Sequence, residues 1–505
     1  MKKFKLLIII MSLIFLLGLV RGKVGEPIAY QKEYDTTLGG PFESSNNSSR
    51  YALTQAIADR FSFELTPKEA KFATPDVVYH NGKFFSIFTP GVSFLGVPLY
   101  IIGKYFGFPQ FTTYLLNVIL AFINMLLVAK LSRKFGAGNI ASYIAGFIFL
   151  FGTNALSYAT TYTQHHLTIL VILLSLLNLF GKRTFLKNVV LGGLFGIGLL
   201  ADIPNAFFFI PVLLYALYKS FDKKQIEEKV ALSLKLNIVG LIFGILPFLA
   251  LFGWYNHTLT GSYTLTGQLI GRSDVMEVNG KIIAKPRSGT KKLQIEKKLP
   301  FDTRNQLNGL YILLISDERG WLIYSPVIII GFIGLYVSLK KKNVNGNTIL
   351  AVAVILTVVT SYSMFGDPWG GWSFGPRYLL PATAIASAGI GVLIEKFKQN
   401  KTFVIVFAVI SIYSITISLV GAITTNAVPP KVEAVNLSEP IPHTYQYNLK
   451  LLEKDFSSSI AYNLYFAKFI SARYFVTSYL VVISSILFIS LIATQKDQIR
   501  ERENI

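Results

Sequence analysis

The side chains best suited to chemistry lie in short polar stretches between long apolar segments of the chain. They are carboxylates, imidazoles, guanidiniums and indoles, the groups that move protons or bind anions. The candidates are Asp35, Glu43, Asp59, Asp76, His165, His166, Asp202, Asp317, Glu318, Arg319, Asp367, Trp369, Trp372 and Arg377. The chain has no Cys, so disulfides, thiolate metal sites and Cys nucleophiles are excluded.

Arg377 has the most specific chemistry of these candidates. It follows Gly375 and Pro376 at the head of an apolar segment, in the sequence Gly-Pro-Arg-Tyr. A guanidinium is a rigid fork of donors that binds a phosphate through two parallel hydrogen bonds. We therefore expect Arg377 to bind a phosphate group.

The other candidates each have a structural interpretation as well. Trp369 and Trp372 are typical of the aromatic belts at a membrane interface. His165 and His166 are too few to indicate a metal site, so we expect no metal cofactor. The sequence 317–319 is equally consistent with a local charge network, and loop carboxylates are usually only solvated. The candidates therefore need an element that brings them together.

The elements that must position these groups are membrane-spanning helices. Of the 505 residues, 52% are hydrophobic and only 15% are charged, whereas soluble proteins carry about 25% charged residues. The apolar blocks approach the roughly 20 residues that cross a bilayer. They lie at about 4–20, 111–129, 139–156, 167–181, 188–202, 205–218, 236–254, 321–339, 348–364, 378–394, 402–422 and 474–493. The predicted fold class is an all-α polytopic membrane protein with about 12 transmembrane helices.

The basic residues predict how these helices are oriented. One set of connections between blocks holds at least three Lys or Arg each, whereas the short connections of the other set hold only Arg377. Because cytoplasmic loops are enriched in Lys and Arg, both termini are expected in the cytoplasm of a cell-membrane protein. The first block is expected to be retained rather than cleaved. The net charge of +21 reflects this topology rather than a nucleic-acid partner.

Three long segments are expected on the outer side, at about 21–110, 255–320 and 425–473. In the first, apolar residues recur at helical spacing over 50–60, and Ser48 or Ser49 is the expected N-cap. Residues 91–107 are apolar but interrupted by a proline and a lysine. We expect them to form an interfacial or re-entrant helix rather than a span.

Three stretches resemble the GT-C superfamily of membrane glycosyltransferases, and protein mannosyltransferase-like and aminoarabinose-transferase-like proteins in particular. They are Ser45–Asp59, Thr74–Ser93 with Pro98-Leu-Tyr100, and Trp369–Pro381. The resemblance implies a GT-C-like domain over 1–422, including the outer loops 21–110 and 255–320. An outer loop without an assigned role would follow over 423–473, and a last helix with a cytoplasmic tail over 474–505.

The resemblance also implies a reaction. These enzymes take sugars from polyprenyl-phosphate carriers, with a loop carboxylate as general base and inversion at the sugar. Arg377 and Tyr378 match the family's Arg-Tyr position and would hold the donor phosphate. In relatives an acid often stands just before the Arg-Tyr of the first loop helix, where this chain has Asn46 and Asn47.

The expected base is therefore Asp76, with Asp35 as the second candidate and His165 as an assisting group. The other residues expected around the pocket are Asn47, Arg50, Tyr51, His165, His166, Asp202, Asp367 and Trp372. The expected partners are a polyprenyl-phosphate-linked sugar, membrane lipids, and a lipid, glycan or protein acceptor.

Two alternative functions remain at this point. One is another handler of lipid-linked glycans, such as a polymerase, ligase or flippase, although a flippase should have polar residues deep along several helices. The other is a non-catalytic membrane protein, which the missing acid before Arg50 favours.

Overall fold

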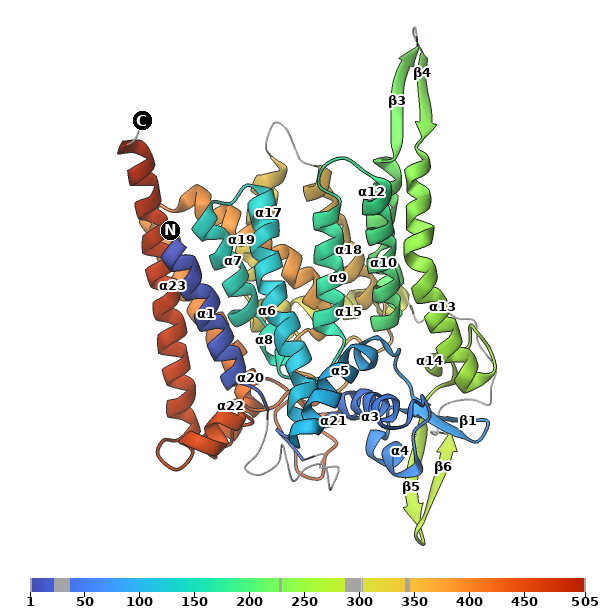
Figure 1. Cartoon of the computed structure of the whole chain (residues 1–505). Helices are drawn as coiled ribbons and strands as arrows, with labels where there is room; N and C mark the ends of the chain where they lie inside the picture. Colours follow the sequence, from blue (N-terminus) through green and yellow to red (C-terminus); the bar gives the residue numbers. More distant parts are fainter. Residues whose placement is uncertain are drawn as a thin grey trace.

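Helices that run side by side form a bundle, and both chain termini lie at one end of it (Figure 1). The computed structural model describes residues 2–21, 37–226, 229–286, 301, 303–340 and 346–503. The bundle helices are α1 (Lys2–Gly18), α6 (Pro109–Phe135), α7 (Asn139–Phe151), α9 (His165–Asn178), α10 (Phe185–Ala201), α12 (Ile210–Tyr218), α13 (Gly240–Thr260), α17 (Ile328–Leu339), α18 (Gly346–Ser363), α19 (Leu380–Phe397), α20 (Lys401–Ile423) and α23 (Ala472–Glu503).

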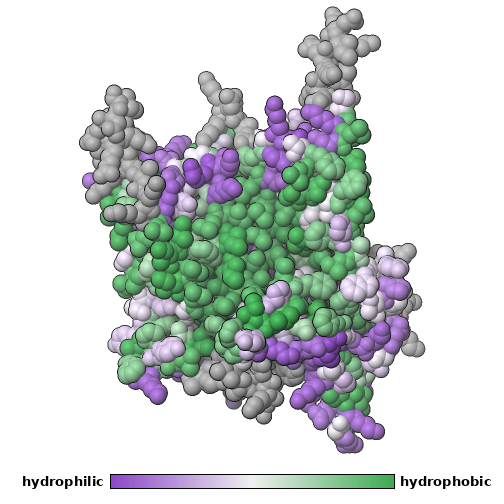
Figure 2. All heavy atoms as spheres, in the orientation of Figure 1, coloured by the Kyte–Doolittle hydropathy of each residue, from purple (hydrophilic) through white to green (hydrophobic). Residues whose placement is uncertain are grey.

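The apolar surface of the bundle fits a membrane protein. Among the described residues, six helical segments are long and apolar enough to cross a membrane. They are Pro109–Phe135, Leu236–Thr260, Gly346–Ser363, Arg377–Phe397, Lys401–Ile423 and Ala472–Gln495. The other predicted spans fall on shorter apolar helices, so the count of about twelve stays a prediction. Figure 2 shows an apolar band across the visible face of the bundle, with hydrophilic residues at both of its ends.

Two predicted spans are each interrupted by three residues in the structure. The block 139–156 was predicted as one helix, but α7 ends at Phe151, and the short helix α8 (Ala155–Ala159) is separate. The side chain of Thr153 accounts for the break, because its Oγ1 accepts from the Ala155 amide at 3.2 Å. The block 321–339 divides into α16 (Trp321–Tyr324) and α17, since Pro326 disfavours helical backbone at the residue before it.

The interior helix of the bundle is α19, which packs on α6, α7 and α17. Its residues from Leu380 to Ile394 are all buried. Small residues allow the close approach: a Cβ on Gly389 would lie 2.1 Å from the carbonyl oxygen of Gly331 in α17. Close backbone packing of this kind is common between helices in membranes. It fixes the N-terminal end of α19, where Arg377 lies.

The end of the bundle opposite the termini carries most of the loop structure (Figure 1). The first long loop forms α3 (Ser45–Arg60), α4 (Pro67–Ala73), the strands β1 (Val77–His80) and β2 (Lys83–Ser86), and α5 (Gly91–Phe106). We refer to this end as the loop end.

The helix predicted over 50–60 exists, but the predicted cap is wrong. The helix α3 begins at Ser45, so Ser48 and Ser49 lie inside its first turns. The Oγ of Ser48 donates to the Ser44 carbonyl, and the Oγ of Ser49 donates to the Asp76 carbonyl at 2.6 Å. The Ser49 hydroxyl therefore ties α3 to the residue before β1, rather than capping the helix.

The segment 91–107, expected to be interfacial or re-entrant, forms α5. It packs against α3 and α6 and lies across the loop end of the bundle in Figure 1. Its large apolar side chains Leu95, Ile101, Ile102, Tyr105 and Phe106 are exposed. Exposed apolar side chains on a helix are typical of an interfacial helix, and the position of α5 relative to the membrane stays a prediction.

Within the described ranges, three hairpins depart from the predicted all-α fold. The strands β1 and β2, β3 (Phe221–Ile226) and β4 (Lys229–Leu234), and β5 (Ser273–Val278) and β6 (Lys281–Pro286) pair antiparallel. Two of the turns are Asn-Gly, at residues 81–82 and 279–280, with positive φ at both positions. Asn-Gly is the strongest short-range hairpin signal, and the sequence interpretation overlooked it.

The segment predicted as an outer loop without an assigned role is folded against the bundle. The Nδ2 of Asn448 in α22 (Gln446–Glu453) donates to Thr424 Oγ1 at 2.8 Å and to the Thr425 carbonyl at 2.7 Å, just beyond α20. The remaining elements are α11 (Asn205–Phe208), α14 (Gly267–Ile270), α15 (Gln306–Leu314), α21 (Lys431–Ala434), the 3-10 helices Leu236–Val239, Thr303–Asn305 and Arg377–Leu379, and the π-helix Tyr462–Phe466.

Candidate functional site

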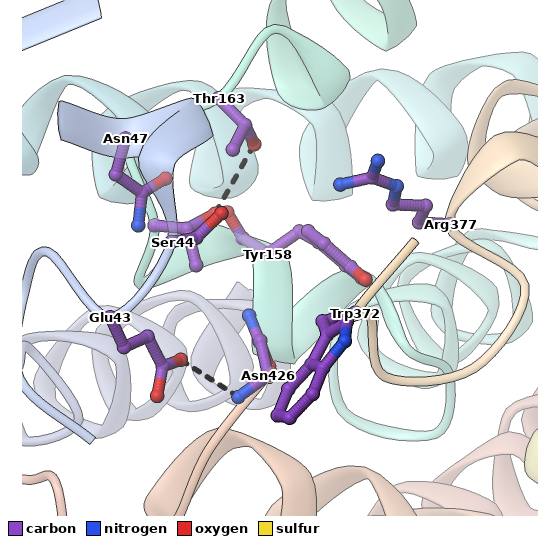
Figure 3. A pocket seen from close by; sticks show the side chains of 9 residues that line it. Glu43, Ser44, Asn47, Tyr158, Thr163, Trp372, Arg377 and Asn426 are labelled. Atoms are coloured by element: carbon purple, nitrogen blue, oxygen red, sulfur yellow. Dashed lines mark hydrogen bonds between the residues drawn. The ribbon is translucent and has the colours of Figure 1, made fainter. Parts of the chain in front are cut away.

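A hollow at the loop end brings together residues that are far apart in the sequence (Figure 3). They come from the start of α3, from the α8 region, from the loop before α19 and from the segment after α20. The lining residues are Glu43, Ser44, Asn47, Tyr158, Thr161, Thr163, Trp372, Arg377 and Asn426. We call this hollow the loop-end pocket.

Arg377 reaches the pocket from a glycine-rich loop. Gly370, Gly371 and Gly375 all have positive φ, a conformation that side chains strongly disfavour. A Cβ on Gly370 would lie 2.8 Å from the Arg377 Nε, so a glycine is also required for the close approach. Among the described residues Arg377 forms no ion pair, and its Nε has no hydrogen-bond partner. Its guanidinium lies 5.4 Å from the ring centroid of Tyr378.

Arg319 holds the loop that carries Arg377. Its side chain is fully buried and donates to the carbonyl oxygens of Trp369 at 3.1 Å and Gly371 at 3.2 Å. It also donates to the Ser373 hydroxyl and to the Val428 carbonyl. Burial lowers the pKa of Arg319. The residue therefore organises backbone rather than forming the charge network that was one interpretation of residues 317–319.

A second arginine, Arg50 of α3, lies within electrostatic range of Arg377. Its side chain is only 1% exposed and stacks on Phe88, with 3.8 Å between the guanidinium carbon and the ring centroid. It donates to the side chain and the carbonyl of Asn46, while its Nε has no partner within the described part of the chain. Desolvation lowers the pKa of Arg50 to about 10, which leaves it charged at neutral pH.

Two carboxylates partly offset the burial of Arg50, and neither lines the pocket. Asp202 accepts from Gln164 Nε2 at 3.0 Å, and its charge raises the pKa of Arg50. Asp76 acts on Arg50 in the same direction; it accepts from Ser45 Oγ at 2.7 Å and pairs with Arg272 at 2.7 Å. Asp35, the second predicted base, lies outside the described residues.

The carboxylate that does line the pocket is Glu43, which the sequence listed among the candidates but not as the expected base. Its two oxygens accept from the buried Arg21 guanidinium, the Gly39 and Asn426 amides and the Thr425 hydroxyl. The residue immediately precedes the cap of α3. The signal available in the sequence was an acid just before the expected first loop helix, upstream of Arg50.

The two predicted histidines differ in their surroundings. His166 is fully buried, and its ring nitrogens lie 2.9 Å from the Ala155 carbonyl and 3.3 Å from Asn124 Nδ2. It is a satisfied core residue. His165 packs edge-on against Tyr158, within electrostatic range of both Arg50 and Arg377. The Nε2 of His165 has no hydrogen-bond partner among the described residues.

Of the remaining predicted pocket residues, some line the pocket and others lie in or next to the loop that carries Arg377. Asn47 and Trp372 line the pocket. Tyr378 stacks face to face on Tyr362, with ring centroids 4.3 Å apart. Asp367 is exposed and accepts from the Gly370 amide at 3.1 Å, which shapes the glycine-rich loop.

Tyr51, also predicted at the pocket, is instead buried in the aromatic cluster of Phe42 and Tyr100. No group of three or more potential metal ligands occurs in the part of the chain that the structure describes.

Comparison with known proteins finds similarity in structure only. No family model and no curated protein matches the sequence. The crystal structure of apo ArnT from Cupriavidus metallidurans matches with a TM-score of 0.52 and 10% identity, covering 97% of this chain and 75% of ArnT. ArnT bound to undecaprenyl phosphate matches with a TM-score of 0.50, 12% identity and the same coverage.

The apo oligosaccharyltransferase from Archaeoglobus fulgidus matches with a TM-score of 0.49 and 12% identity, covering 85% of this chain and 57% of that one. ArnT, an aminoarabinose transferase, and this oligosaccharyltransferase both belong to the GT-C superfamily. At these identities the likeness is one of fold.

Proposed function

Because the chain has the GT-C fold, we propose that it is a membrane glycosyltransferase that moves a sugar from a polyprenyl-phosphate carrier to an acceptor at the loop end of the bundle. The observation that carries the proposal is the pair of guanidiniums, Arg50 and Arg377, at this end. Neither forms an ion pair with a described residue, and each has an Nε without a hydrogen-bond partner.

A bound anion would offset the free-energy cost of burying these two arginine side chains. Burying a charge without a counter-ion costs several kcal/mol. Guanidinium donors that are held in place and unsatisfied are suited to a phosphate, which offers several acceptor oxygens. A lipid carrier can place its phosphate at the two arginines because its polyprenyl chain stays in the bilayer beside the bundle. The ArnT structure with undecaprenyl phosphate supports a lipid phosphate as the ligand of such a fold.

The chemistry needs a base as well as the phosphate site. In the proposed reaction an acceptor hydroxyl attacks the anomeric carbon, the bond to the phosphate oxygen breaks and the sugar inverts. Arg377 and Arg50 stabilise the negative charge of the departing polyprenyl phosphate. Asp76, although not one of the nine lining residues, is the proposed acceptor of the hydroxyl proton. Its charge acts on Arg50, and its ion-pair partner Arg272 has a side chain that is 49% exposed.

The side of the membrane follows from charge. Basic connections occur at the end of the bundle where both termini lie, and cytoplasmic loops are enriched in basic residues. We therefore assign the termini to the cytoplasm and the loop end to the outer face. The acceptor is accordingly a lipid, glycan or protein present on that face.

The test is sugar transfer by the purified full-length protein in lipid nanodiscs. Radiolabelled polyprenyl-phosphate monosaccharides serve as donors and a membrane extract supplies acceptors. We expect transfer by the wild type and by Arg133→Ala, an exposed arginine at the other end of α6, and none by Arg377→Ala. Full activity of Arg377→Ala in a folded protein would refute the phosphate role.

A further inference from the structure

Two asparagines of the loop-end pocket have fixed amide orientations. The Nδ2 of Asn47 donates to the Pro41 carbonyl at 3.0 Å, and the Nδ2 of Asn426 donates to the Ser157 carbonyl at 2.8 Å. Both side chains are more than nine-tenths buried. Each amide oxygen is thereby left as an acceptor, and neither has a hydrogen-bond partner among the described residues. A buried acceptor without a partner is unfavourable, so a ligand that donates hydrogen bonds here would be stabilised.

The groups beside these oxygens are hydroxyls. Ser44, Thr161 and Thr163 line the same pocket, and a hydroxyl both donates and accepts. Trp372 adds an aromatic surface, since its indole nitrogen is already engaged by Glu433. Neutral acceptors and hydroxyls around an aromatic ring are suited to an uncharged ligand that carries several hydroxyl groups.

The one carboxylate among the nine lining residues does not change this chemistry. Each oxygen of Glu43 already accepts two hydrogen bonds, one of them from the buried Arg21 guanidinium. A carboxylate has about four lone-pair sites in total. Glu43 is therefore not free to bind an ammonium group of an amino sugar.

The charged groups around the pocket also favour an uncharged ligand. Arg377 lies on the far side of the pocket from Asn47 and Glu43 in Figure 3, so a donor phosphate at Arg377 places its sugar toward the asparagines. An ammonium on that sugar would lie in the same pocket as the Arg377 cation, without a free carboxylate among the nine lining residues. A uronate carboxylate would face the amide oxygens, which repel it.

We propose that the sugar on the donor is a neutral, hydroxyl-bearing one, recognised by the amide oxygens of Asn47 and Asn426. This inference rests on the proposed function, because it assumes that the carrier phosphate binds Arg377. It adds the chemical class of the transferred sugar, which neither the fold nor the arginines specify.

The test is competition for binding rather than transfer, because it needs no acceptor. The full-length protein in nanodiscs is loaded with radiolabelled polyprenyl phosphate. Four unlabelled competitors share one carrier chain: bare polyprenyl phosphate, and its neutral hexose, amino-sugar and uronic-acid conjugates. Two satisfied acceptors should make the hexose conjugate about tenfold better than the bare carrier. The charged conjugates should be no better than the bare carrier.

The outcomes separate the two claims. If bare polyprenyl phosphate does not bind, the proposed function fails and this inference fails with it. If the bare carrier binds, but a charged conjugate competes as well as the hexose conjugate, the inference alone is overturned. Equal competition by the hexose conjugate and the bare carrier would overturn it as well.

Variants assign the effect to the amides. Asn47→Ala and Asn426→Ala should each reduce the affinity of the hexose conjugate, relative to the bare carrier in the same variant, about threefold to tenfold. Thermal unfolding of each variant reports correct folding. Asn47→Asp should give the amino-sugar conjugate an advantage that the wild type lacks. Asn436→Ala, an exposed asparagine on the same face, is the matched control. An unchanged hexose advantage in both alanine variants would overturn the assignment.

Discussion

The buried guanidinium of Arg319 donates to the carbonyl oxygen of Val428 across 2.8 Å, although 109 residues separate them in the sequence. The same side chain holds Trp369 and Gly371. One residue therefore joins the loop that carries Arg377 to the segment that carries Asn426. These two segments form two walls of the loop-end pocket, and Arg319 sets their distance.

Replacing Arg319 should damage both stability and the site. Arg319→Gln loses several hydrogen bonds to buried carbonyl groups, so we expect a loss of about 2–4 kcal/mol in the free energy of unfolding. Thermal unfolding in detergent measures it, with the exposed Arg133→Gln as control. The folded fraction should bind polyprenyl phosphate more weakly than the wild type. An unchanged melting temperature would show that the loop holds its shape without Arg319.

The sequence predicted the helical membrane fold because a long apolar segment in a bilayer must satisfy its own backbone hydrogen bonds, as a helix does. It did not predict the breaks at Gly152 and Ser325, since the Thr153 hydroxyl and Pro326 that account for them hardly change the hydropathy of a long apolar block. The sequence also contained the Asn-Gly turns of two hairpins. Their strands were not predicted because they are short and lie in loop segments whose charge and hydropathy do not indicate strands. The cap of α3 was misplaced because Ser49 makes its bonds to Asp76, a tertiary contact.

The sequence predicted the arginine that lines the pocket, but it did not predict which carboxylate lines it. Arg377 was identified because Lys and Arg are normally enriched in cytoplasmic loops, and it is the lone basic residue in the short connections predicted on the outer side. Glu43 was a candidate but not the expected base, and Asn426 was not a candidate. Their positions at the pocket depend on the packing of α3 and on the turn after α20. Asn46, expected to mark a missing acid, instead accepts from Arg50.

Arg50 should be needed as a cation of fixed shape. In Arg50→Lys the charge remains, but the stacking on Phe88 and the fork of donors are lost. We expect polyprenyl-phosphate affinity to fall about tenfold, by the loss of one charge-assisted hydrogen bond. Equilibrium binding in nanodiscs measures this. Affinity equal to that of the wild type would remove Arg50 from the phosphate site.

Glu43 should act as a structural anchor rather than as the base. Glu43→Gln leaves the buried Arg21 without its counter-charge, so we expect a destabilisation of about 3–5 kcal/mol. The double variant Arg21→Met with Glu43→Gln should recover part of that loss, because no buried charge remains unpaired. Thermal unfolding of the three proteins decides the point. If Glu43→Gln is as stable as the wild type yet inactive, Glu43 is the base instead.

The choice of base is tested by comparing two carboxylates. Asp76→Asn should abolish sugar transfer while leaving polyprenyl-phosphate binding intact, since the amide cannot accept the hydroxyl proton. Asp202→Asn should retain transfer, because its bond with Gln164 is replaced by an amide pair. Transfer assays at saturating donor, with binding measured in parallel, separate catalysis from affinity. Transfer lost only in Asp202→Asn would move the base to that residue.

The most direct measurement is the affinity of purified wild type, Arg377→Ala and Arg377→Lys for bare polyprenyl phosphate in nanodiscs. Charge-assisted hydrogen bonds contribute about 1.5–3 kcal/mol, so Arg377→Ala should bind about tenfold to a hundredfold more weakly. Arg377→Lys should fall between the two because it keeps the charge without the fork. Equal affinity of the three proteins, all correctly folded, would contradict a phosphate site at Arg377.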